Sequence, residues 1–131
     1  MSTQEKAAEQ RILEAVLDVI EKKGIQALTT RDIAQAAGVN IAAINYYFRT
    51  KDAAVAAALA MALRHMQEDF AVILAEPGTP FMSVLEQALE YLLEGAFLYP
   101  RIVMAHFYPA LMDGQYDTPG AQAMRAVVDG L

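Results

Sequence analysis

The chain has 131 residues, of which 56% are hydrophobic and 20% charged. This composition is too apolar for a disordered segment, and the length fits one compact domain or two small layers that share a core. It contains no cysteine, which excludes a disulfide scaffold, a thiolate zinc site and a cysteine nucleophile. The net charge is −6, but residues 1–51 hold seven Lys and Arg against six acids, whereas residues 52–131 hold three against ten. An ordinary acidic protein could show this asymmetry by chance, and a polyanion-binding first segment remains compatible with it.

Four helices with recognisable ends are predicted in the first part of the chain. Gly24 follows the first apolar stripe as a C-terminal stop. Thr29, with Asp32 three residues later, resembles a capping box, and Asn40 and Thr50 are suitable caps for the two helices that follow. These four helices cover residues 5–23, a short segment that stops at Gly38, residues 41–48 and residues 51–75.

The next predicted helix follows the chain break at Pro77-Gly78. Thr79 is expected to cap it, with Pro80 at its first helical position. One face carries a stripe of apolar residues and the other carries glutamates, so the stripe is expected to face inward. The stripe consists of Phe81, Val84, Leu85, Ala88, Leu89 and Leu92.

Two more helices complete the predicted fold. The first restarts at Pro100 and contains the apolar run 102–112, in which Pro109 is expected to kink or split the helix. Thr118, followed by a proline, caps the last one. No segment shows the alternation typical of a strand, so the predicted fold class is all-α.

The segment 30–49 has the pattern of a helix-turn-helix. Ala34 is a small residue where two helices can touch, and Gly38, four residues later, tolerates the positive φ of a turn. Branched residues that can fix the second helix follow the same pattern. They are Ile33, Val39 and Ile44.

More residues make this match specific. The run from Leu28 to Asp52 resembles the DNA-binding signature of the tetracycline-repressor (TetR) family of bacterial regulators. The shared features are a threonine, an Ile-Ala pair, Ala-Gly-Val, a tyrosine-rich turn, a phenylalanine and a lysine that begins helix four. In this chain they are Thr30, Ile33-Ala34, Ala37-Gly38-Val39, Tyr46-Tyr47, Phe48 and Lys51. Asn45 stands where the family most often has tyrosine.

The resemblance implies a role for each matching position. The helix after Asn40 would enter the DNA major groove with a small, polar exposed face, and Asn45 would contact adenine edges. Thr30, Tyr47 and Lys51 would contact phosphates. The complete set of expected DNA-binding residues is Thr30, Arg31, Asn40, Ile41, Ala42, Ala43, Asn45, Tyr46, Tyr47 and Lys51.

Several of these positions allow a plainer interpretation. Asn40 fits a helix cap as well as a DNA contact, and Tyr46 and Tyr47 fit an interface between proteins. Lys51 without the motif would be an ordinary surface lysine. The alternative function is therefore a helical protein–protein interaction module that does not bind DNA.

The resemblance divides the chain into a DNA-binding domain at residues 1–51 and a helical ligand-sensing and dimerisation domain at residues 52–131. It implies a cytoplasmic homodimeric repressor that leaves a palindromic double-stranded DNA operator when a small apolar effector binds. No cofactor, metal or membrane partner is implied. Such residues at helical spacing more often belong to an ordinary core than to a pocket. The candidate ligand-binding residues are Met66, Phe70, Leu89, Leu92, Phe97, Met104, His106 and Phe107.

Two further expectations concern the end of the chain and catalysis. The family usually adds two long dimerisation helices, so the second domain is expected to be truncated after Leu131. The chain has no Glu-x-x-His pair, glycine-rich phosphate loop or nucleophile elbow, so no enzymatic activity is expected.

Overall fold

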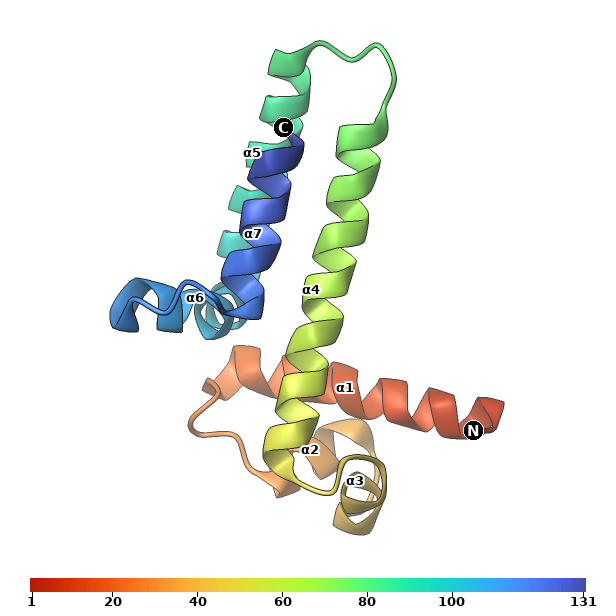
Figure 1. The fold of residues 1–131 in the computed structure, drawn as a ribbon. Coiled ribbons are helices and arrows are strands. Elements are labelled where there is room, and N and C mark those ends of the chain that lie inside the picture. The colour runs from red at the N-terminus through yellow and green to blue at the C-terminus, as the bar shows by residue number, and fades with distance from the viewer. The chain divides into compact units, whose positions relative to one another are not determined.

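The computed structural model describes residues 1–131 and is entirely helical, which confirms the predicted fold class (Figure 1). Seven helices follow one another, and no strand is present. They are α1 (Thr3–Lys23), α2 (Thr30–Ala37), α3 (Ile41–Phe48), α4 (Lys51–Ala75), α5 (Phe81–Leu98), α6 (Pro100–Asp113) and α7 (Pro119–Gly130). None of these helices combines the length and the apolar character required to cross a membrane.

The chain forms two compact units, Met1–Met61 and Ala62–Leu131. The division falls inside α4, so one continuous helix contributes its first part to one unit and its second part to the other. A functional boundary after residue 51 stays a prediction.

Local capping explains where the helices of the first unit begin. The predicted Thr29 capping box is present, because Thr29 Oγ1 accepts from the Asp32 N–H and Asp32 accepts from the Thr29 N–H. The Ala53 N–H donates to Thr50 Oγ1, which confirms the cap of α4. Helix α1 begins two residues earlier than predicted, because Ser2 and Glu5 form a second capping box.

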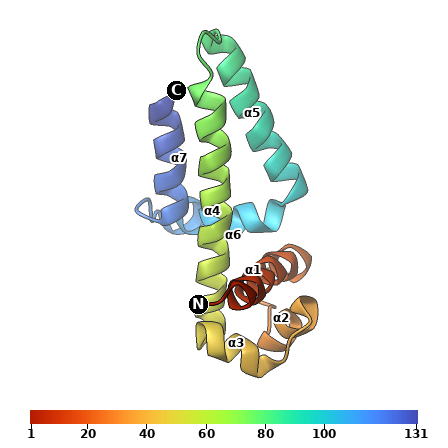
Figure 2. The same cartoon turned by 90° about the vertical axis from the view of Figure 1, so that its right-hand side faces the viewer.

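The core of the first unit lies among its helices. Helix α1 packs on α2, and α2 packs on α3 (Figure 2). Fully burying an aliphatic side chain of this size contributes about 1.5–3 kcal/mol to folding. The large side chains of this core are at most 1% exposed, and they are Ile12, Val16, Ile20, Leu28, Ile33 and Ile44.

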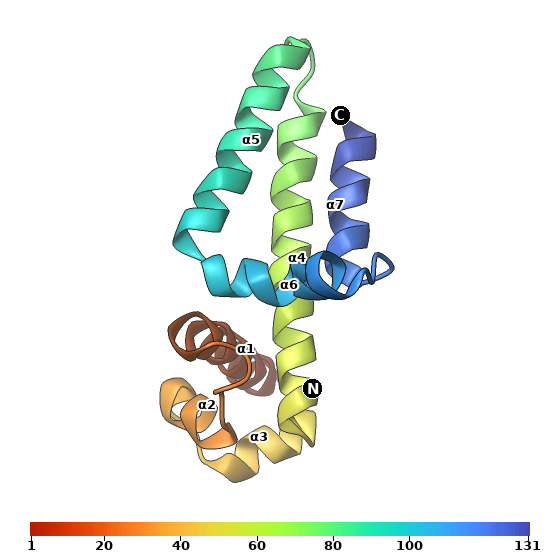
Figure 3. The same cartoon turned by 90° about the vertical axis from the view of Figure 1, so that its left-hand side faces the viewer.

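In the second unit, the later part of α4 runs beside α5 and α7, and α6 joins the end of α5 to the start of α7 (Figure 3). Phe70 of α4, Ala88 of α5 and Val127 of α7 form its buried cluster. The Tyr91 ring lies edge-on to Phe70 with 5.0 Å between centroids, and its hydroxyl donates to Asp69 Oδ2 over 2.7 Å. The contacts around Phe70 therefore join α4, α5 and α7.

Two sequence expectations for the second unit are wrong, and of the two outcomes expected at Pro109 the split does not occur. Pro80 is the N-cap of α5 rather than its first helical residue, and no side chain caps this helix, so Thr79 does not. Leu89 and Phe81 of the expected inward stripe are 51% and 57% exposed, because the buried contacts of α5 centre on Ala88. Pro109 does not split α6, which continues to Asp113. The proline lacks an N–H to donate, but its carbonyl accepts from the N–H groups of the two residues just beyond the helix.

Candidate nucleic-acid interface

The helix-turn-helix has the backbone geometry that its sequence predicts. Gly38 ends α2 in the left-handed region with φ 67°, and its N–H donates to the Ala34 carbonyl. The Val39 N–H donates to the same carbonyl over 3.0 Å. Two residues later α3 begins, so glycine at position 38 allows a turn that other residues adopt only with strain.

Helix α3 has one buried side and one exposed side. Ile44 is completely buried, and this anchors the helix in the first unit. Ile41 is 42% exposed and Tyr46 is 73% exposed, and Ala42 and Asn45 are exposed between them. Residues at this spacing share one side of a helix. The exposed side is therefore formed by small, apolar, amide and phenol side chains, and α3 itself contributes no carboxylate to it.

The remaining predicted residues of α3 are partly buried. Ala43 and Tyr47 are half-buried, next to the core side of the helix. The rings of Tyr46 and Tyr47 meet edge-on with 5.1 Å between centroids, and Tyr47 is tilted against Phe48 at 6.4 Å. The ring of Tyr47 therefore has an aromatic neighbour on each side along α3.

Asn40 acts as a helix cap. Its Oδ1 atom accepts from the Ala43 N–H over 2.8 Å, and its backbone is extended, as expected for an N-cap. This bond uses the amide oxygen and not the two N–H donors of the side chain. The two interpretations from the sequence, cap and DNA contact, are therefore chemically compatible.

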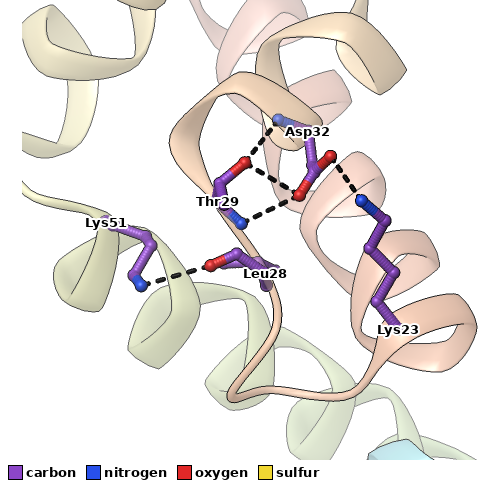
Figure 4. A network of polar contacts seen from close by, with 5 residues as sticks. All are labelled: Lys23, Leu28, Thr29, Asp32 and Lys51. Carbon is purple, nitrogen blue, oxygen red and sulfur yellow. Dashed lines mark hydrogen bonds and ion pairs between the residues drawn. The ribbon is translucent and has the colours of Figure 1, made fainter.

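The start of α2 lies next to the start of α4. Lys51 Nζ donates to the Leu28 carbonyl over 3.2 Å, which links the first residue of α4 to the segment before α2 (Figure 4). Thr30 and Arg31, the first two residues of α2, follow this segment directly and are half-buried and exposed, respectively. The unpaired N–H groups at helix starts favour anions, as does an ammonium group.

An ion pair connects α1 to the same segment. Lys23 Nζ lies 2.7 Å from Asp32 Oδ1, and the other carboxylate oxygen of Asp32 accepts from Thr29 (Figure 4). The hydrogen bond from Lys23, followed by those from Thr29, lowers the pKa of Asp32 to about 2. Sequence spacing predicts the Asp32 cap but not its partner, because Lys23 lies in another helix beyond a loop.

Arg49 is a second feature that sequence reasoning missed. It has φ 66° and ψ −45°, and it is the sole residue other than glycine with a positive φ. The Thr50 N–H donates to the Phe48 carbonyl over 2.8 Å, which closes a three-residue γ-turn around Arg49. This tight turn lets α4 begin only three residues after α3 ends. Nothing in the residue type signals it, since arginine rarely adopts this backbone conformation.

The candidate ligand-binding residues of the second unit occupy different environments. Phe70 belongs to the buried cluster, and Met66 and Leu92 pack against it. The remaining candidates do not join that cluster. Leu89, Phe97 and Met104 are largely exposed, with Phe97 at 82%, and His106 and Phe107 are half-buried. Ligand binding by these residues stays a prediction.

His106 has an unusual environment within the second unit. Its Nε2 atom is buried and has no hydrogen-bond partner. Burial lowers the pKa of His106, because a charged imidazolium loses hydration there. Gly120 at the start of α7 packs directly on the His106 backbone, so closely that a Cβ at position 120 would lie 2.7 Å from the His106 carbonyl oxygen.

Comparisons with known proteins agree with this geometry. Residues 12–58 match the family described as bacterial regulatory proteins of the tetR family. The crystal structure of the multidrug binding protein EbrR, complexed with imidazole, is similar to this chain, with a TM-score of 0.57 and 27% sequence identity. That similarity covers 92% of this chain and 67% of the other. Among curated proteins no match was found.

Proposed function

The chain belongs to the TetR family of bacterial regulatory proteins, and from this membership we propose that it is a dimeric repressor released from a palindromic operator by a small apolar ligand. The family fold makes it a DNA-binding transcription regulator. In the proposal, residues 1–51 contact DNA and residues 52–131 bind ligand and dimerise, in the cytoplasm and without catalysis.

The observation that carries the DNA-binding proposal is the two-sided character of α3. Ile44 anchors it, and Ile41, Ala42, Asn45 and Tyr46 share an exposed side. Small side chains allow the helix backbone to approach base edges in the major groove, and isoleucine and alanine can contact a thymine methyl group. We assign base contacts to Ile41, Ala42, Ala43, Asn45 and Tyr46, with Asn40 at the helix start.

Phosphate contacts are assigned to groups around the starts of α2 and α4. Thr30 and Arg31 stand at the first of these, and Lys51 stands at the second. Lys51 donates one hydrogen bond to the Leu28 carbonyl, and an ammonium group has three donors. Two donors of Lys51 therefore remain for a phosphate. A contact with a DNA phosphate is also assigned to the Tyr47 hydroxyl, since the Tyr47 ring packs against the rings of Tyr46 and Phe48.

The ligand response is supported by the second unit and by the relative. EbrR is a multidrug binding protein, and its similarity extends over 92% of this chain. Helix α4 is continuous from Lys51 to Ala75 and belongs to both compact units. A ligand that binds better to one position of α4 would shift the population of DNA-binding conformations, to an extent set by its difference in affinity.

The test is selection of binding sites from a pool of random DNA duplexes by the purified full chain at two salt concentrations. We expect an inverted repeat to be enriched, with weaker binding at the higher salt because phosphate contacts release counterions. Enrichment of a single half-site would contradict the dimer. No enrichment by a folded sample at low salt would overturn DNA binding and favour the alternative, a helical interaction module that uses Tyr46 and Tyr47 to contact a protein.

A further inference from the structure

The segment 28–32 is held from two sides. On one side, Lys51 Nζ donates to the Leu28 carbonyl over 3.2 Å. On the other, Lys23 Nζ contacts Asp32 Oδ1 at 2.7 Å, and Asp32 in turn accepts from Thr29 (Figure 4). The starts of α2 and α4 and the last turn of α1 are thereby connected through five residues.

Asp32 creates an electrostatic conflict at this position. A carboxylate at the third residue of a helix completes the capping box and interacts favourably with the positive end of the helix dipole. The same carboxylate places a full negative charge one residue from Arg31 and two from Thr30, both assigned to DNA contact. Its low pKa keeps it ionised throughout the pH range of DNA binding. DNA phosphates near this helix start would be repelled by it.

We propose that Lys23 is a positioning residue for DNA binding, which acts by neutralising the capping carboxylate of Asp32 at the start of α2. The inference rests on the proposed DNA-binding function, and it adds a residue that lies outside every predicted DNA contact. Lys23 does not touch the duplex in this scheme. Its ammonium group allows α2 to keep an acidic cap, which stabilises the helix, while the start of the helix presents no net negative charge to a phosphate.

The geometry distinguishes Lys23 from its neighbour. Lys22 stands in the same last turn of α1 and is also exposed, whereas Lys23 forms the 2.7 Å ion pair with Asp32. A change at either position removes one positive charge from almost the same place on the first unit. Lys22→Met is therefore a matched control for the general effect of charge on attraction to DNA.

The experiment measures the affinity of the full chain for a fluorescently labelled, mixed-sequence duplex of about three helical turns at low salt. We expect Lys23→Met to weaken binding about five- to tenfold and Lys22→Met about twofold or less. The difference between the two variants should shrink as salt is raised, because screening weakens the repulsion by Asp32. Equal losses in the two variants, at comparable thermal stability, would overturn the proposal.

Asp32→Asn separates neutralisation from a simple mechanical role of the ion pair. Asparagine keeps an oxygen that can accept from the Thr29 N–H but carries no charge. If Lys23 acts by neutralisation, Asp32→Asn binds the duplex at least as tightly as the parent, and Lys23→Met has little further effect in the Asp32→Asn background. If the ion pair only holds the segment in place, Asp32→Asn weakens binding as much as Lys23→Met does, which refutes the proposal.

The outcomes also separate this inference from the proposed function. A parent chain that binds no duplex at low salt contradicts DNA binding itself. A parent chain that binds, together with Asp32→Asn and Lys23→Met variants that both lose affinity, contradicts only the role assigned to Lys23.

Discussion

At the scale of single residues, α3 carries side chains suited to two kinds of DNA contact, those that read bases and those that hold phosphates. Asn45 is exposed, and an asparagine amide can pair with an adenine edge through one donor and one acceptor. Tyr47 is packed between two aromatic rings and has a single hydroxyl to offer. The two side chains are two residues apart on one helix, yet we assign them different functions.

This difference predicts that two alanine variants affect DNA binding in different ways. Asn45→Ala should flatten the base preference at one position of each half-site, with a cost of about 1–3 kcal/mol confined to the preferred base. Tyr47→Ala should weaken binding to every duplex by a similar factor, because a phosphate contact carries no base information. Binding-site selection repeated with each variant measures both effects. An unchanged base profile for Asn45→Ala would contradict the role of Asn45.

His106 predicts a pH dependence of stability. Burial lowers its pKa in the folded chain, so the unfolded chain binds the proton more readily. The free energy of unfolding should therefore fall as the pH drops below the histidine pKa of the unfolded chain, which is about 6.5. The contribution of His106 to this fall should end once the pH is below its pKa in the folded chain. Urea unfolding at pH values from about 7.5 to about 5 measures this slope.

The chain has two histidines, which provides a control. His106→Gln should reduce the loss of stability between those pH values, because glutamine keeps a polar side chain and does not titrate. The exposed His65 gives the matched variant His65→Gln, which should retain the slope of the parent. Identical slopes for His106→Gln and the parent would show that His106 does not cause the dependence.

At the scale of elements, the contact between α6 and α7 depends on a glycine. Gly120 lies against the backbone of His106, whereas Gly95 in α5 has open space where a Cβ would stand. Gly95 lies within α5 and Gly120 is the second residue of α7, so the helical backbone accepts alanine at both positions. The surroundings alone should decide the sign of the two substitutions.

We therefore predict that Gly120→Ala and Gly95→Ala shift stability in opposite directions. A Cβ 2.7 Å from a backbone carbonyl oxygen forces α6 and α7 apart, which should cost about 1–3 kcal/mol. Gly95→Ala should raise stability by about 0.5–1 kcal/mol. Thermal and urea unfolding of the two variants measures the contrast. A stabilised Gly120→Ala variant would contradict the close approach of the two helices.

At the scale of the whole molecule, charge and symmetry determine how the chain would meet DNA. The seven Lys and Arg residues of positions 1–51 nearly balance their six acids, while positions 52–131 carry an excess of seven acids. Attraction to DNA must therefore come from local groups such as Lys51 and Arg31 rather than from net charge. A single α3, with eight residues, can cover only one half-site.

Because one α3 covers one half-site, we predict that two chains bind each selected operator. A two-fold symmetric dimer presents two copies of α3 about 34–36 Å apart, which matches successive major grooves on one side of a duplex. Sedimentation equilibrium of the chain with the selected duplex should give two chains per duplex at saturation. A duplex with one half-site scrambled is the control and should bind more weakly. One chain per intact duplex at saturation would contradict the dimer proposal.

The sequence by itself determined the features that depend on neighbours along the chain. The Thr29–Asp32 capping box, the Asn40 cap, the Thr50 cap and the Gly38 turn all join residues within a few positions of each other. Such interactions need only the local backbone, so residue type and spacing are sufficient to predict them. The family signature depends on the same local spacing, which explains why it was recognisable in residues 12–58.

Only the tertiary structure decided which distant residues meet. The pairing of Lys23 with Asp32 and of Lys51 with the Leu28 carbonyl depends on how loops return the chain to itself. The exposure of Leu89 depends in the same way on which side of α5 has a neighbour, and the isolation of His106 Nε2 depends on what surrounds α6. Apolar spacing identifies an apolar face of a helix, but packing against other helices decides how much of that face is covered.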